Sequence, residues 1–359
     1  MAKHKQAKRH TIPLPTESIP KPAMDSAPIV SALIERPVVA IIILVAAVVL
    51  VYAASVNNGF VFFDDDKAIL YNQALQNPTL SKFFSGQNLG MYAPVTWIGY
   101  WIGSLISDQE AWGYHLLGLL LHATNTALAY LFLRQLLNRH WPAFFAAVLF
   151  ALHPVQVEAV SWAAALSTVL FSTFYLSSLI AYLNWKKTPT LLWLGMSLGA
   201  FVLACLAKSA AVTLPLVLLA IDFYLSKKLI GKFWLSKIPY LIFSIAFGVY
   251  TFVTREQEGH DIETASSAFS FVDRFWMVSQ TLLFYPVKLL APLGFSVSYP
   301  FVKTGGVWPW TYYIAPVVLI ALAVVVWKKA RTNYDILLGV ALYLLPLSVM
   351  LPFRTVGSF

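Results

Sequence analysis

The sequence predicts an all-α polytopic membrane protein. Of its 359 residues, 59 % are hydrophobic and only 11 % are charged, and the mean hydropathy is +0.70. Soluble domains contain about 25 % charged residues. The first apolar run, "PVVAIIILVAAVVLVYAASV", has roughly the 20 residues that a helix needs to cross a bilayer. No internal repeat of about 20 to 50 residues is visible, so we expect one membrane domain at 37–359.

The charge pattern argues against a nucleic-acid-binding protein. The formal net charge is +9, but Lys and Arg occur in short clusters at the ends of apolar runs, as topology determinants do. No soluble basic domain is visible. The single cysteine, Cys205, lies in an apolar run, which argues against a disulfide framework or a thiolate metal site.

Residues 1–36 are basic and then rich in Pro and Ser, without an apolar core of their own. This composition predicts a disordered cytoplasmic tail. A cleaved signal peptide is not expected, because the apolar run that follows is longer than the roughly 7 to 15 residues of a signal-peptide core.

Two apolar segments are expected to lie in the membrane interface or to re-enter rather than to cross. The segment 93–106 is too short for a span, and Pro286 and Lys288 interrupt the segment 274–293. When neither crosses, the basic loops all fall on the cytoplasmic side with the N-terminal tail, as the positive-inside rule requires. These loops are 134–140, 186–187 and 227–237.

This topology has about nine crossings, with the C-terminus outside. It defines two outer loops, 57–113 and 254–310, the first of which contains the sequence "FVFFDDDKAILYN". Ionisable groups at a membrane surface are costly unless they are used. The polar residues at the outer surface are therefore the candidates for a functional site.

Asp64 and Asp65 have two interpretations. One carboxylate acts as a general base toward an acceptor hydroxyl, or Asp65 helps to bind a divalent cation such as Mg²⁺ or Mn²⁺, which prefers oxygen ligands. Alternatively, the aspartates form a solvated cluster or a helix cap. Their position directly after a span, among Phe60, Phe62 and Phe63, favours a functional role.

Other polar residues at the same predicted depth are candidates for substrate binding. In "FALHPVQVEAVSW", His153 and Glu158 either present an imidazole and a carboxylate to a polar headgroup, or only cap the two helices that meet there. Lys208 is suited to a phosphate, or it is a lysine that extends to the interface. Arg255 either binds substrate or pairs with its acidic neighbours.

His115 and His122 lie two turns apart on one helix face. We expect them to act in packing or in interhelical hydrogen bonds rather than as ligands.

The order of these motifs resembles the membrane domain of the transmembrane TPR-containing O-mannosyltransferases and their bacterial relatives, within the GT-C glycosyltransferase superfamily. The resemblance covers roughly residues 57 to 350, and the H-P-x-x-x-E-x-V-x-W corner is its most specific part. It implies a GT-C-like helical bundle, a polyprenyl-phosphate-linked sugar donor, a hydroxyl acceptor on a protein, lipid or glycan, and inversion at the anomeric carbon. It also implies that Asp64 or Asp65 is the catalytic carboxylate, and it matches His153, Glu158 and Lys208 to family positions.

The sequence departs from the family in two places. After Trp162 it has "AAALST" where relatives usually carry a charged stretch, and it ends at "LPFRTVGSF" where relatives continue with further helices and TPR repeats. We therefore expect either a short form or an incomplete chain.

Two other functions remain open at this stage. One is an inactive GT-C-like scaffold or partner protein, and the other is a transporter or flippase. A transporter would concentrate its polar residues at the bilayer midplane, whereas here they gather at one surface. The expected location is a bacterial inner membrane, with the active site facing the periplasm. The alternative is the endoplasmic reticulum membrane, where the same site would face the lumen.

Overall fold

The protein was analysed as a computed structural model, which describes residues 35–85, 92–228, 234–257 and 269–351. The side chains of 252 and 254–257 are not described. Throughout these ranges the regular elements are helices, and the one strand-like pairing is an isolated bridge between Thr304 and Val307. The predicted all-α architecture is confirmed.

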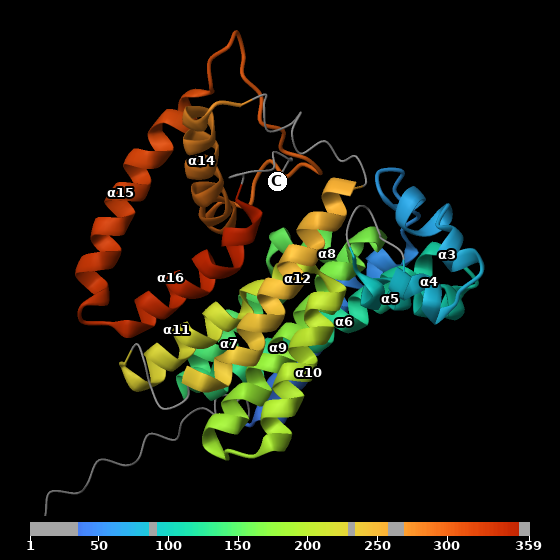
Figure 1. The fold of residues 1–359 in the computed structure, drawn as a ribbon, viewed down its shortest axis with the longest axis horizontal. Helices are drawn as coiled ribbons and strands as arrows, with labels where there is room; N and C mark the ends of the chain where they lie inside the picture. The colour runs from blue at the N-terminus through green and yellow to red at the C-terminus, as the bar shows by residue number, and fades with distance from the viewer. Residues whose placement is uncertain (1–34, 86–91, 229–233, 258–268, 352–359) are drawn as a thin grey trace, which may run out of the picture.

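In the described ranges, ten helices form the main bundle and the group of helices beside it (Figure 1). They are α2 (Pro37–Tyr52), α6 (Ala111–Leu137), α7 (His140–Leu152), α9 (Leu166–Lys187), α10 (Leu191–Ala207), α11 (Leu214–Ser226), α12 (Ile238–Gln257), α14 (Phe271–Leu290), α15 (Trp310–Ala330) and α16 (Tyr334–Leu347).

The 14-residue helix α5 and several short helices fill the connections between these ten. The α-helical ones are α3 (Gln73–Gln76), α4 (Leu80–Ser85), α5 (Pro94–Ser107) and α8 (Val157–Ser161). The π-helix η2 (Asp66–Leu70) follows the aspartates, and the remaining short elements are the 3₁₀ turns η1 (Ala53–Asn57), η3 (Pro154–Gln156), η4 (Ala163–Ala165), η5 (Ser209–Thr213), η6 (Trp234–Lys237) and η7 (Ser348–Met350).

Five of the described helices are long and apolar enough to cross a membrane, or six if α7 and the short helices after it form one span across a 49° bend. Two further apolar helices, Leu191–Ala207 and Tyr334–Met350, are shorter than the roughly 20 residues of an average span. The predicted number of nine crossings therefore remains a prediction. Neither α5 nor α14 is among the candidate spans, and neither is α12, which the predicted topology counts as a crossing. The interfacial position of α5 and α14 therefore also remains a prediction.

The centre of the bundle is held by polar side chains between closely packed helices. Ser178 of α9 and Ser197 of α10 each donate a hydrogen bond to the other's carbonyl, at 2.7 and 2.8 Å. Asn125 of α6 donates to the carbonyl of Val169 of α9 at 2.8 Å. Small polar residues of this kind let helix backbones approach closely within a membrane, so α6, α9 and α10 form a compact core.

The helices α14, α15 and α16 enclose a triangle beside this bundle (Figure 1). They contact the bundle through α16, which packs on α11, and through α14, whose Leu289 carbonyl lies 3.0 Å from His153 Nε2. Within the triangle, Tyr343 of α16 donates to the carbonyl of Leu282 of α14 at 2.8 Å.

Basic residues from separate loops meet at one end of the bundle. The Asp222 carboxylate accepts from Lys186 at 2.6 Å and from the Tyr182 hydroxyl at 2.9 Å, and it also pairs with the fully buried Lys237. Two residues further along α11, Tyr224 donates to Asp335 at 2.8 Å. The predicted inner loops therefore lie together. The 22 residues of α9 separate this basic end from the start of α9 by about 33 Å, close to the thickness of a bilayer core.

We expect Asp222→Asn to destabilise the protein by about 3 kcal/mol, because it leaves the buried Lys237 ammonium without its counter-charge. Thermal unfolding of the purified protein in detergent measures the effect. Asp335→Asn is the matched control, since its ion pair with Arg139 is 41 % and 66 % exposed and such pairs contribute little. Equal losses for the two variants would contradict the assignment.

Candidate functional site

The predicted site gathers where α9 begins, at the end of the bundle opposite the basic residues. Asp65 is fully buried, and both of its oxygens accept backbone hydrogen bonds. Oδ1 accepts from the Ala164 amide at 2.7 Å and Oδ2 from the Val61 amide at 2.8 Å. The carboxylate thereby fastens the first outer loop to the start of α9.

The main chain of Ala164 makes two hydrogen bonds, one through its amide and one through its carbonyl. Its amide reaches Asp65, and its carbonyl accepts the Tyr100 hydroxyl of α5 at 2.7 Å. Ala163, Ala164 and Ala165 are all buried, so their small side chains let the loop and α5 approach the backbone. The "AAALST" stretch, in which the sequence lacks the family's charged residues, therefore holds the site together through its main chain.

Asp64 is in a different environment from Asp65. Its side chain is half-buried, and among the described residues it makes no hydrogen bond or ion pair. Burial raises the pKa of the Asp64 carboxyl, the nearby Lys67 lowers it, and Asp66 and Asp65 raise it further. Burial also raises the pKa of Asp65, against the effect of its two backbone hydrogen bonds. Asp64 is thus the carboxylate that is available to a substrate.

Lys208 follows the last residue of α10 and reaches across to α9. Its Nζ donates to Thr168 Oγ1 at 2.9 Å, which leaves two of the three ammonium donors without a partner among the described residues. Burial lowers the pKa of Lys208, and the negative charge of Glu158 raises it. Glu158 itself is exposed in the first turn of α8.

His153 sits at the corner between α7 and α8 and is nearly buried. Its Nδ1 accepts from the Val155 amide at 3.2 Å, and its Nε2 lies 3.0 Å from the Leu289 carbonyl of α14. A carbonyl can only accept, so this pattern requires a ring protonated on Nε2 alone. His153 thus joins the corner to α14, and a direct contact with substrate would have to replace one of these two bonds.

An exposed aromatic rim borders the loop that carries the aspartates. Phe62 and Phe63 are 76 % and 50 % exposed, and the Phe63 ring lies 5.9 Å from that of Trp162. Aromatic rings are favoured at the membrane–water interface. The rim therefore fits a site at headgroup depth.

Comparisons with known proteins agree with this arrangement, although no family model and no solved structure matches the chain. Protein O-mannosyl-transferase TMTC2 of Mus musculus is 32 % identical over 138 residues, which is 35 % of this chain and 16 % of the relative. Protein O-mannosyl-transferase TMTC3 of Homo sapiens is 30 % identical over 158 residues (41 % and 17 %), and Tmtc2 of Drosophila melanogaster is 32 % identical over 182 residues (46 % and 19 %).

The resemblance to the TMTC O-mannosyltransferases is confirmed. The chain spans less than a quarter of the length of these relatives.

Of the residues predicted for the TMTC-like site, five come to the same end of the bundle: Asp64, Asp65, His153, Glu158 and Lys208. Asp65, Lys208 and Glu158 are linked through the start of α9 by the contacts above. Arg255 belongs to α12, but its side chain lies outside the described residues.

A metal site at Asp65 does not fit the residues around it. Within the described ranges, no group of three His, Cys, Asp or Glu side chains is placed to hold an ion. Both Asp65 oxygens are already bound to backbone amides. A divalent cation therefore has no part in the mechanism derived below.

Thr168, Tyr100 and the Ala164 backbone were not predicted from the sequence. Thr168 is the third residue of α9, in its first turn, and its hydroxyl positions Lys208. A threonine near the start of an apolar run gives little signal by itself, and a backbone amide gives none.

The prediction that the two histidines of α6 act in packing or in interhelical hydrogen bonds is confirmed for His122, whose Nε2 lies 3.0 Å from the Ala151 carbonyl of α7. His115 is almost completely buried and lies in the electrostatic field of Asp65.

We expect Asp65→Ala to lower the free energy of unfolding by about 3 kcal/mol, because the Val61 and Ala164 amides lose a charged acceptor and Ala164 is buried. Chemical or thermal unfolding in detergent measures the loss. Asp64→Ala serves as the control and should unfold close to wild type. If the two variants are equally stable, Asp65 does not hold the loop.

Proposed function

We propose that the protein is a membrane glycosyltransferase that moves a sugar from a polyprenyl-phosphate-linked donor to an acceptor hydroxyl on the extracytoplasmic face, with Asp64 as the catalytic base. The observation that carries this proposal is the contrast between the two aspartates. Asp65 is buried and bound through both oxygens, while Asp64, next to it, is half-buried and has no partner among the described residues.

The chemistry needs few groups. Asp64 takes the proton of the acceptor hydroxyl, the acceptor oxygen bonds to the anomeric carbon, and the bond from that carbon to the phosphate oxygen breaks on the opposite face. The configuration of the sugar is therefore inverted. The lipid phosphate leaves with a negative charge, which the free ammonium donors of Lys208 are suited to stabilise.

The elevated pKa of Asp64 suits this role. A stronger base accepts the hydroxyl proton more readily, provided that it is still ionised at the working pH. Burial raises the pKa of Asp64, which moves this carboxylate in the required direction. Asp65 then acts as a positioning residue, since it fixes the loop from which Asp64 projects.

The relatives' names supply the acceptor and the sugar of this proposal. They are protein O-mannosyl-transferases, so we take mannose as the first sugar to test and a protein hydroxyl as the first acceptor, ahead of lipid and glycan acceptors. The relatives are much longer than this chain, so these assignments depend on the shared portion alone.

The proposed topology has nine crossings, with the basic end in the cytoplasm and Asp64 outside, in a bacterial inner membrane whose site faces the periplasm. The clustering of Lys186, Lys237 and Arg139 at the end of the bundle remote from Asp65 supports this orientation, because inner loops carry the excess of Lys and Arg.

We expect Asp64→Asn to reduce sugar transfer by at least about 100-fold, the usual contribution of a general base, while donor binding persists. The measurement uses purified protein in nanodiscs with a panel of polyprenyl-phosphate sugars, and it follows donor binding and product formation separately. Asp66→Asn, two residues further along, is the matched control. Undiminished transfer by Asp64→Asn would exclude Asp64 as the base, and a wild type that binds no donor would favour a scaffold or transporter.

The pH dependence offers a second test. Transfer should fall on the acid side as Asp64 is protonated, and since burial raises its pKa, this limb should lie above the pH of an ordinary aspartate. Lys67→Gln removes a charge that lowers the pKa of Asp64, so the limb should move to higher pH. Lys82→Gln, exposed in the same outer loop and bonded to the Asn77 carbonyl, should leave the limb in place. Coinciding profiles for all three proteins would argue against Asp64.

A further inference from the structure

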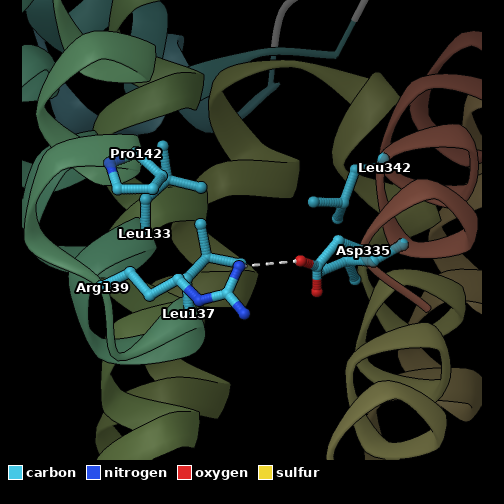
Figure 2. Close-up of a pocket in the computed structure, with 8 residues that line it drawn as sticks. Leu133, Leu137, Arg139, Pro142, Asp335 and Leu342 are labelled. Atoms are coloured by element: carbon cyan, nitrogen blue, oxygen red, sulfur yellow. Dashed lines mark hydrogen bonds and ion pairs between the residues drawn. The ribbon is translucent and has the colours of Figure 1, made fainter. Parts of the chain in front are cut away.

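A narrow apolar pocket lies at the basic end of the bundle, between α6, α7 and α16 (Figure 2). Its volume is about 260 Å³, just below the range of pockets that hold drug-sized ligands. Its walls are the aliphatic side chains of Leu133, Leu137, Pro142, Leu338 and Leu342, with Gly339. The residues from Asp335 to Leu342 of α16 span about 10 Å, so the pocket extends roughly two helical turns from this end.

Two charged residues complete the lining. Arg139 donates to Asp335 Oδ2 at 3.2 Å, and their side chains are 66 % and 41 % exposed. Figure 2 shows the two side chains meeting between the leucines of α6 and Leu342. Asp335 is held from behind by the Tyr224 hydroxyl at 2.8 Å. Arg139 uses only one of its five N–H donors in a hydrogen bond to a described residue. The other four donors are therefore available to an anion.

The surroundings of this pair are cationic. Lys227 lies over the rings of Tyr224 and Tyr334, at 4.3 and 4.0 Å, and Tyr224 is the residue that binds Asp335. Lys328 and Lys329 lie in the last turn of α15, and Arg331 follows in the short connection to α16. One carboxylate is thus outnumbered by lysines and arginines, and basic pockets between transmembrane helices on the inner side attract anionic lipid headgroups.

We propose that this pocket binds an anionic phospholipid of the adjacent leaflet, with one acyl chain between Leu133, Leu338 and Leu342 and the phosphate on Arg139. The occupant follows from the two halves of the site. A soluble anion would leave the apolar walls unfilled, and a neutral lipid would offer no anion to the Arg139 donors that Asp335 does not use. A phospholipid with a negative headgroup satisfies both halves.

This site is separate from that of the proposed sugar transfer. Arg139 and Asp335 lie at the end of α9 where Lys186 meets Asp222, whereas Asp64 lies near the start of α9, about 33 Å away along a helix of 22 residues. Lipid binding here therefore does not depend on the transferase proposal, and either can fail alone.

Gly339 allows the pocket to be filled without strain. It lines the pocket, and a Cβ added to it would meet no heavy atom within 4 Å. Gly339→Leu should therefore occupy the space of the acyl chain. Gly195 of α10 is also helical and also open at the Cβ position, but it is not part of the pocket, so Gly195→Leu is the matched control.

The experiment is native mass spectrometry of the full chain purified in detergent and titrated with phosphatidylglycerol, phosphatidylcholine or diacylglycerol. Wild type and Gly195→Leu should retain phosphatidylglycerol best. Gly339→Leu should weaken this binding roughly tenfold through loss of the apolar contacts, and Arg139→Gln about fivefold through loss of one cation. Arg139→Gln leaves the walls intact, so it tests the site even where Gly339→Leu fails to fold.

Two results would overturn the proposal. Equal retention of phosphatidylglycerol by all four proteins would show that the pocket is not the site. Equal binding of phosphatidylcholine or diacylglycerol and phosphatidylglycerol by wild type would show that Arg139 does not select the headgroup.

Discussion

The end of the bundle at which α9 begins depends on one buried carboxylate, Asp65. Asp65 accepts one hydrogen bond from the Val61 amide of its own loop and one from the Ala164 amide just before α9. It thus lies at the boundary between the loop 57–113 and the bundle. Charged groups are buried at a high cost unless their hydrogen bonds are satisfied. The two amides supply that satisfaction and leave little freedom in where the loop can sit. The position of Asp64, the rim of phenylalanines and the approach of α5 all follow from it.

The end of the bundle at which α9 ends is organised around a second carboxylate, Asp222, which binds charged side chains instead of main-chain amides. There the acceptor serves two lysine side chains and a tyrosine, and it draws α9, α11 and η6 together. The protein thus uses an acidic residue at each end of α9. One binds amides and orders a loop, while the other neutralises part of a basic cluster. Between them the helices are joined by serine, asparagine and threonine contacts rather than by charges.

Much of this organisation could be predicted from composition and charge. The helical membrane class follows from the apolar runs, and the common end of the basic loops follows from the positive-inside rule applied to Arg139, Lys186 and Lys237. The grouping of Asp64, His153, Glu158 and Lys208 could be predicted because each stands beside a long apolar run, at the same predicted depth.

The different roles of Asp64 and Asp65 could not be predicted, since the two residues are adjacent and chemically identical. They are distinguished by amides from Val61 and Ala164, and a main-chain amide is present at every residue except proline. The hydrogen bonds of His153 could not be predicted from the sequence either. They go to main-chain groups, and one of these, the Leu289 carbonyl, is 136 residues away.

The hydrogen bond from the Ala164 amide to Asp65 has a consequence for which substitutions the sequence can accumulate in evolution. A side-chain donor can be lost by almost any substitution, but a main-chain donor disappears only when proline replaces the residue. What position 164 must retain is small size, because Tyr100 and Asp65 both approach its peptide. Glycine or serine would meet that demand as well as alanine. Two proteins could therefore share this anchoring geometry and show no shared letter at the residue that provides it, so a search for identical residues would undervalue the start of α9.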